Sequence, residues 1–201
     1  MDAPYPKVFG IGLSRTGTTS LTEALRALGY RAVHFPLAIV REDEGRLTLD
    51  ARAAARFDAL TDTPAALLFR ELDAAFPGSK FILTTRRTEA WLASMRRLRA
   101  SYAFLRFIPK VAQLTEALYG PRTYDDEQTL RARFARHRAQ VEAYFSKRME
   151  RDVLVLDFES GDGWRELCAF LGREVPHAPF PHANRSYGTT LRNMFDFAGY
   201  R

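Results

Sequence analysis

Short and nearly all-apolar runs recur along this 201-residue chain and predict buried strands. Four runs fit this description: Lys7–Gly12, Arg31–Phe35 ("RAVHF"), Lys80–Thr85 ("KFILTT") and Val153–Asp157 ("VLVLD"). Segments with helical spacing of apolar residues separate them. Alternating strands and helices are typical of an α/β fold, in which helices cover both faces of a central parallel sheet.

Proline, glycine and capping residues predict where the helices begin and end. Gly29 ends the first helix, Asp50 can cap a short one, and Pro64 suits a first turn. The segment Pro36–Asp50 is predicted to be irregular, and the Pro-rich tail to be a loop before a last short helix. The predicted helices run from Thr18 to Leu28, from Asp50 through Phe57, from Pro64 to just before Pro77, from Thr88 to about Arg99, from Asp126 to Met149 and from Trp164 to Leu171.

Length and composition are consistent with one globular domain over residues 1–201, with 46% apolar and 27% charged residues. No run of about 18 apolar residues occurs, and the first residues lack a signal-peptide pattern, so we expect a cytoplasmic protein without a membrane span. The only cysteine, Cys168, shares a helical face with apolar residues and is expected to be a structural thiol. The four histidines lack zinc-site spacing, so no metal is expected.

The net charge is +6, and arginine supplies most of it. Guanidinium groups match phosphate and sulfate oxygens, so this composition favours anionic ligands. Nucleic-acid binding is the competing interpretation, but the basic run Leu130–Arg138 fits a solvated helix face better.

The stretch "GIGLSRTGTTS" after the first predicted strand resembles a phosphate-binding loop. Gly12 and Gly17 have the P-loop spacing and Thr19 fits its last position, but Thr18 stands where the lysine belongs. The dinucleotide fingerprint fails because Arg15 replaces its third glycine. Amides at a helix N-terminus, with hydroxyls beside them, can still bind an anion. The missing lysine predicts a ligand other than a nucleoside triphosphate with magnesium.

A second anion-binding pattern follows the strand Lys80–Thr85. Arg86 stands at the end of this strand, and Ser94 lies eight residues later, about two turns into the next helix. A forked guanidinium and a hydroxyl at this spacing can converge on one phosphate group.

Together, these motifs are similar to those of sulfotransferases that use 3′-phosphoadenosine 5′-phosphosulfate (PAPS). "SRTGTTSL" resembles the 5′-phosphosulfate loop of that family, and Arg86 with Ser94 resembles its 3′-phosphate motif. Arg87-Thr88 departs from the usual Asp-Pro of that motif. The stretch "GDGWRELCAFLGREVPHAPFPHAN" resembles one sulfotransferase subfamily, so the similarity spans about Lys7 to Asn184.

The resemblance implies a P-loop-like sulfotransferase fold, PAPS as the sulfuryl donor, 3′-phosphoadenosine 5′-phosphate (PAP) as a product, and no required metal. It implies that Arg15 contacts the transferring sulfuryl group and that Thr18 and Thr19 hold the 5′-phosphate. A C-terminal loop with Arg185 and Gly188 would also contact the 3′-phosphate. The nucleotide-binding residues expected from it are Ser14, Arg15, Thr16, Gly17, Thr18, Thr19, Ser20, Arg86, Ser94 and Arg185.

Sulfuryl transfer to a hydroxyl needs a base that takes the proton of the acceptor. Asp62-Thr63-Pro64 resembles the family's His-x-Pro element with aspartate in place of histidine, so Asp62 is the first candidate. A helix cap at Asp62 is an equally good interpretation. His34 is the second candidate, with a packed structural histidine as its alternative, and Asp58 could hold either group in place.

We expect the acceptor to be a small molecule or a carbohydrate. Tyr102, Phe104, Phe107 and Tyr119 could line an apolar cleft, although a packed helical hairpin explains them equally well. A homodimer is compatible with the sequence. Two other function classes stay open: a nucleotide-dependent P-loop kinase, and a non-catalytic protein that binds nucleotides or nucleic acid.

Overall fold

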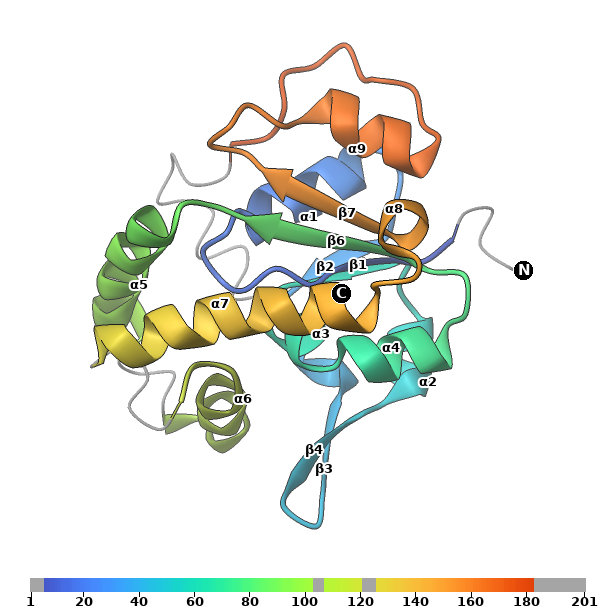
Figure 1. Cartoon of the computed structure of the whole chain (residues 1–201). Helices are drawn as coiled ribbons and strands as arrows, with labels where there is room; N and C mark the ends of the chain where they lie inside the picture. The colour runs from blue at the N-terminus through green and yellow to red at the C-terminus, as the bar shows by residue number, and fades with distance from the viewer. Residues whose placement is uncertain (1–5, 103–106, 121–125, 183–201) are drawn as a thin grey trace.

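The computed structural model describes residues 6–102, 107–120 and 126–182 (Figure 1). Its central sheet has five parallel strands, which confirms the predicted α/β fold class. In spatial order the strands are β2 (Ala32–His34), β5 (Ala59–Thr61), β1 (Val8–Gly10), β6 (Lys80–Thr85) and β7 (Val153–Asp157). Because all five run in one direction, their carboxyl ends meet at one edge of the sheet.

Helices cover both faces of this sheet, as Figure 1 shows. One face carries α1 (Thr18–Ala27) and α9 (Trp164–Leu171), and the other carries α3 (Thr63–Leu67), α4 (Phe69–Ala75) and α7 (Glu127–Tyr144). Two further helices, α5 (Thr88–Tyr102) and α6 (Pro109–Tyr119), pack against α7. The short elements are η1 (Leu37–Ile39), α2 (Ala51–Ala55) and α8 (Met149–Asp152).

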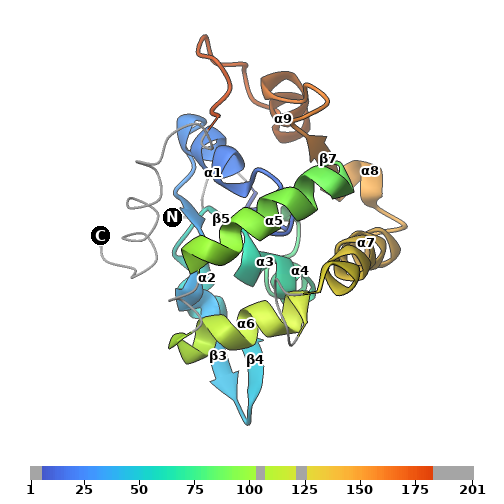
Figure 2. The same cartoon turned by 90° about the vertical axis from the view of Figure 1, so that its left-hand side faces the viewer.

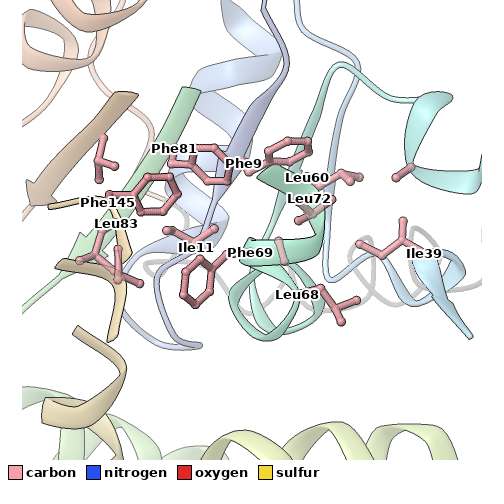
Figure 3. Packing of buried hydrophobic residues seen from close by; sticks show 14 of the residues in the cluster. Phe9, Ile11, Ile39, Leu60, Leu68, Phe69, Leu72, Phe81, Leu83 and Phe145 are labelled. Atoms are coloured by element: carbon pink, nitrogen blue, oxygen red, sulfur yellow. The ribbon is translucent and has the colours of Figure 1, made fainter. Parts of the chain in front are cut away.

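The alternation of side chains along the strands divides the core into two layers. Val8 and Ile82 point to the layer beneath α1 and α9, whereas their neighbours Phe9 and Phe81 point to the layer beneath α7. In this second layer the ring of Phe81 lies 5.4 Å from Phe9 and 4.7 Å from Phe145, measured between centroids (Figure 3). Burial on both faces explains why the strands are apolar runs in the sequence.

The prediction that Pro36–Asp50 is irregular was wrong, because this segment contains an antiparallel hairpin. Its strands are β3 (Val40–Asp43) and β4 (Arg46–Leu49), and it extends away from the sheet (Figure 2). Glu44 and Gly45 have φ values of 47° and 75°, as a two-residue hairpin turn requires. The outer residues of the hairpin are charged and exposed, so no apolar run marks its strands.

Three other parts of the described chain differ from the prediction. The prediction missed β5 (Ala59–Thr61), because Asp58 and Asp62 flank it closely and leave no longer apolar run such as those around β1 and β2. The single helix expected from Pro64 to Pro77 is two helices, α3 and α4, that meet at Leu68, where ψ is 21°. The long helix ends at Tyr144, before the expected Met149. The helix expected in the tail lies outside the described residues.

Candidate active site

The loop between β1 and α1 lies at the carboxyl edge of the sheet, where parallel α/β sheets bind ligands. Gly17 is the N-cap of α1 and has a φ of 102°; a Cβ there would lie 2.5 Å from the Phe158 ring. A Cβ on Gly12 would lie 2.0 Å from the Thr84 hydroxyl. Both glycines are therefore required by the backbone, and the first amides of α1 can face an anion.

Buried side chains hold the backbone of this loop at Ser14. The Ser14 amide donates to the Tyr119 hydroxyl at 3.0 Å, and the Trp91 indole donates to the Ser14 carbonyl oxygen at 2.9 Å. Thr16 Oγ1 donates to the Leu13 carbonyl oxygen at 2.7 Å. The loop is thus fixed by α5 and α6 as well as by its own turn. Burial raises the pKa of Tyr119 to about 12, so its hydroxyl stays protonated.

Arg15, Ser94 and Arg86 form one cluster at this edge. Arg15 has a φ of 73°, and its Nε donates to Ser94 Oγ at 2.9 Å. Arg86 Nη1 donates to the Arg15 carbonyl oxygen at 3.0 Å. The structure therefore brings Arg15 into contact with Arg86 and Ser94, which lie 71 and 79 positions away from it in the sequence.

Asp62 lies at the end of β5, and its buried carboxylate is surrounded by donors. Oδ1 accepts from Ser14 Oγ at 2.5 Å and from the Thr63 amide at 2.6 Å, and Oδ2 accepts from Thr18 Oγ1 at 2.8 Å. His34 Nε2 lies 2.8 Å from Oδ2. Burial alone would raise the pKa of Asp62, but the charge and hydrogen bond of His34 and the two hydroxyls outweigh it and hold this pKa well below its usual value.

His34 ends β2 and faces the same loop. Its Nε2 is also 3.3 Å from Thr18 Oγ1 and 3.1 Å from Thr19 Oγ1. Because the ionised Asp62 can only accept, Nε2 carries the proton shared with Asp62. The other ring nitrogen, Nδ1, is buried and has no hydrogen-bond partner in the part of the chain that the structure describes. A polar nitrogen without a partner is costly to bury, so a ligand hydroxyl that forms a hydrogen bond with Nδ1 would be stabilised.

Backbone strain gathers at three adjacent strand ends. Arg15 after β1, Phe35 after β2 and Asp62 after β5 have φ values of 73°, 52° and 76°. Positive φ is unfavourable for residues with a Cβ and, where it persists, clusters at functional sites. Within residues 6–102, 107–120 and 126–182, Glu44 of the hairpin turn is the one other non-glycine residue with positive φ. The strain therefore makes this edge the candidate functional site.

A cavity of about 510 Å³ opens beside the loop. Arg86 reaches it from the end of β6, and Glu159 reaches it from beyond β7. These two side chains form an ion pair between Arg86 Nη2 and Glu159 Oε1. The residues that line the cavity are Thr16, Gly17, Ser20, Thr85, Arg86, Phe158, Glu159 and His182. Four of them belong to the predicted nucleotide-binding set, and sequence analysis missed the others.

Several sequence expectations concern residues that the structure places elsewhere. Asp58 was wrongly expected beside the base: it precedes β5, at the opposite edge of the sheet, and accepts from Arg31 at 2.9 Å. Tyr119 is buried under the loop and does not line a cleft, whereas Phe107 is exposed. The side chains of Tyr102 and Phe104, and all of Arg185 and Gly188, lie outside the described residues.

Other groups of the described chain take no part in this site. Cys168 is buried under α9, and burial raises the pKa of its thiol, as expected of a structural cysteine. Across residues 6–102, 107–120 and 126–182, no group of three His, Cys, Asp or Glu residues could hold a metal ion. Over the same ranges, every helix is too short or too polar to cross a bilayer.

Known proteins resemble this chain in sequence and in fold. The model of the sulfotransferase domain family matches residues 7–188. Ava biosynthesis cluster protein M of Aspergillus versicolor is 28% identical over an alignment of 219 positions, which covers 90% of this chain and 82% of that protein. A sulfotransferase from Alicyclobacillus acidocaldarius superposes with a TM-score of 0.55 and 16% identity over 98% of this chain and 94% of its own. At that identity the similarity concerns the fold.

Proposed function

The chain belongs to the sulfotransferase family, and from this premise we propose that it transfers a sulfuryl group from PAPS to a hydroxyl or amine of a small molecule or carbohydrate. The observation that carries the proposal is the cluster of Arg15, Ser94 and Arg86 beside the N-terminus of α1. It offers two guanidinium groups and the first helix amides to a ligand with two separate anionic groups. PAPS has such groups at its 5′ and 3′ positions.

We assign the 5′-phosphosulfate to the loop. The amides of Thr18 and Thr19 would hold the phosphate, and Ser14, Thr16, Gly17 and Ser20 would complete the cradle. Arg15 would stabilise the charge that develops on the bridging oxygen as the sulfur–oxygen bond breaks. Arg86 would bind the 3′-phosphate from inside the cavity, with Ser94 orienting the neighbouring Arg15.

For the base we propose a dyad of His34 and Asp62. Asp62 alone is a weak base, because its donors lower its pKa and its oxygens are already occupied. It is better suited to orient His34, whose Nδ1 would take the acceptor's proton. The acceptor oxygen would then bond to sulfur while the sulfur–oxygen bond to the 5′-phosphate breaks, and PAP would leave with both electrons of that bond.

A small-molecule acceptor is the better supported of the two acceptor classes. The Aspergillus relative is named for a biosynthesis cluster, which is consistent with a small-molecule acceptor. Apolar residues beside His34, among them Phe35, Leu37 and Val111, form a small cluster against which an apolar molecule could pack.

Thermal denaturation with PAP, and separately with ATP and magnesium, tests the proposal. A ligand that binds the native state raises the melting temperature. At one hundred times its dissociation constant it adds about 2.7 kcal/mol to the free energy of unfolding. We expect a clear shift with PAP and little with ATP and magnesium. The reverse result would support the kinase alternative and remove the sulfotransferase assignment. Release of PAP in the presence of PAPS and a panel of alcohols and phenols would then identify the acceptor class.

A further inference from the structure

The guanidinium of Arg86 is only partly used within the described chain. Nη1 donates to the Arg15 carbonyl oxygen, and Nη2 pairs with Glu159. Nε is buried and has no hydrogen-bond partner among the described residues. Nε and Nη2 share the edge on which two parallel N–H bonds can grip two oxygens of one anion. Glu159 therefore occupies half of the edge that a phosphate would use in full.

Glu159 is held at this position by a backbone hydrogen bond to Asp157 and by its ion pair with Arg86. It follows the carboxyl end of β7, and its amide donates to Asp157 Oδ1 at 2.9 Å. Its side chain is 29% exposed and lines the same cavity as Arg86. Burial raises the pKa of Glu159, but the hydrogen bond and charge of Arg86 outweigh it, so the pKa is lowered. An ionised carboxylate thus lies where the proposed function places a phosphate.

Arg87 gives the same carboxylate a second partner. Its Nε lies 3.6 Å from Glu159 Oε2, and its side chain is 79% exposed. No other carboxylate pairs with Arg87 in the described part of the chain. Arg87 is also the residue at which this chain departs from the usual Asp-Pro that follows the phosphate-binding arginine. Glu159 therefore stands between an arginine inside the cavity and an arginine in solvent.

We propose that Glu159 competes with the 3′-phosphate of the nucleotide for Arg86, and that Arg87 receives the Glu159 carboxylate when the nucleotide binds. The proposal rests on the proposed function, because it takes Arg86 as the 3′-phosphate ligand. It makes Glu159 and Arg87 positioning residues that set nucleotide affinity and product release without contacting the reacting atoms. Two like charges cannot share one guanidinium edge without repulsion, so one of the anions must leave.

Calorimetric titration of PAP into the full chain and its variants tests this exchange. Glu159→Gln removes the competing charge and should tighten PAP binding about two- to tenfold. Arg87→Ala removes the outer partner and should weaken PAP binding about two- to threefold. In the Glu159→Gln background, Arg87→Ala should have no effect, because no carboxylate remains to be received. This non-additivity separates the exchange from a direct contact.

The pair Arg138 and Glu142 on α7 provides a matched control. Its side chains are 54% and 43% exposed and joined at 2.7 Å, and Arg138→Ala or Glu142→Gln should leave PAP affinity unchanged. Weaker or unchanged PAP binding by Glu159→Gln would overturn the competition. Equal losses from Arg87→Ala in both backgrounds would show that Arg87 contacts the nucleotide. If the unmodified chain binds no PAP at all, the proposed function itself fails, and this proposal fails with it.

Discussion

Arg15 Nε donates a hydrogen bond to Ser94 Oγ at 2.9 Å, which links the loop after β1 to helix α5. The sequence motifs suggested that Arg15 and Ser94 lie at opposite ends of a nucleotide site. In the structure they touch, and Ser94 is 1% exposed. The serine is therefore placed to orient the guanidinium that we assign to the sulfuryl group.

Replacing these two residues should have unequal effects on catalysis. Arg15→Ala removes a cation from the developing charge, so we expect kcat to fall about 10²- to 10³-fold. Ser94→Ala leaves the Arg15 cation in place but removes the hydrogen bond that orients it, so we expect kcat to fall about tenfold. Steady-state rates with saturating PAPS measure both. Ser79→Ala is the control, since Ser79 is a buried serine bonded to the Phe76 carbonyl oxygen away from the loop. An unchanged kcat in Ser94→Ala would exclude the orienting role.

Asp62→Asn should lower turnover about 10²- to 10⁴-fold while PAP still binds. Oδ2 of Asp62 accepts from both Thr18 and His34, and an amide nitrogen at that position could accept from neither. The imidazole would then lose the orientation that directs Nδ1 to the acceptor. Turnover and PAP titration on the same preparation separate the two effects.

The control for this variant is Asp50→Asn. Asp50 is also an N-cap whose carboxylate accepts a backbone amide, from Ala53 at 2.9 Å, but it lies at α2. We expect it to cost a little stability and no activity. Near-normal turnover in Asp62→Asn would remove Asp62 from the mechanism and leave it as a helix cap.

The turn between β1 and α1 could be predicted from the sequence because its signal is local. Gly17 and the threonines after it specify both the turn and the start of α1 within a few residues. Glu159 was predictable in principle, because it follows the apolar run of β7 and must lie at the same edge of the sheet. Glu159 belongs to no known motif, so its place beside Arg86 was not predicted.

The remainder of the site depends on contacts between distant parts of the chain. The Ser14 amide meets the Tyr119 hydroxyl across 105 positions, and no spacing rule relates them. Tyr119, an aromatic residue in an apolar segment, was expected to line a cleft. In the structure its hydroxyl instead accepts a hydrogen bond from the buried Ser14 amide, which needs an acceptor. The polar residues Asp58 and Asp62 on either side of β5 likewise hid the strand that places Asp62 beside His34.

Tyr119→Phe should loosen the loop. It leaves the Ser14 amide without its acceptor, which costs about 1–3 kcal/mol for a buried donor. We expect a lower melting temperature and a PAPS KM raised several-fold, with a smaller change in kcat. Tyr144→Phe is the control, since it also removes a tyrosine hydroxyl, bonded to Asp73 at 2.8 Å, from a more exposed position. Equal losses of stability in both variants, with an unchanged KM, would contradict the anchoring role.

His137 should make stability depend on pH through its burial beneath the same loop. It is 7% exposed, and its Nε2 donates to the Ile11 carbonyl oxygen at 2.7 Å. Burial lowers the pKa of His137, which outweighs the hydrogen bond to Ile11. The folded state therefore resists a proton that the unfolded chain accepts near pH 6.5. Stability from this group is complete above about pH 6.5 and is lost as the pH falls below it, by at most about 1.4 kcal/mol per pH unit.

Melting temperatures at pH 7.5 and pH 5.5 measure this dependence. His137→Gln keeps a donor for Ile11 but cannot titrate, so its melting temperature should fall less over this interval than that of the unmodified chain. His177→Gln is the control, because His177 is exposed and lies outside the core. The same acid-induced loss in His137→Gln as in the unmodified chain would assign the pH dependence to another group. Since Ile11 leads directly into the loop, we expect PAP binding to weaken over the same pH interval.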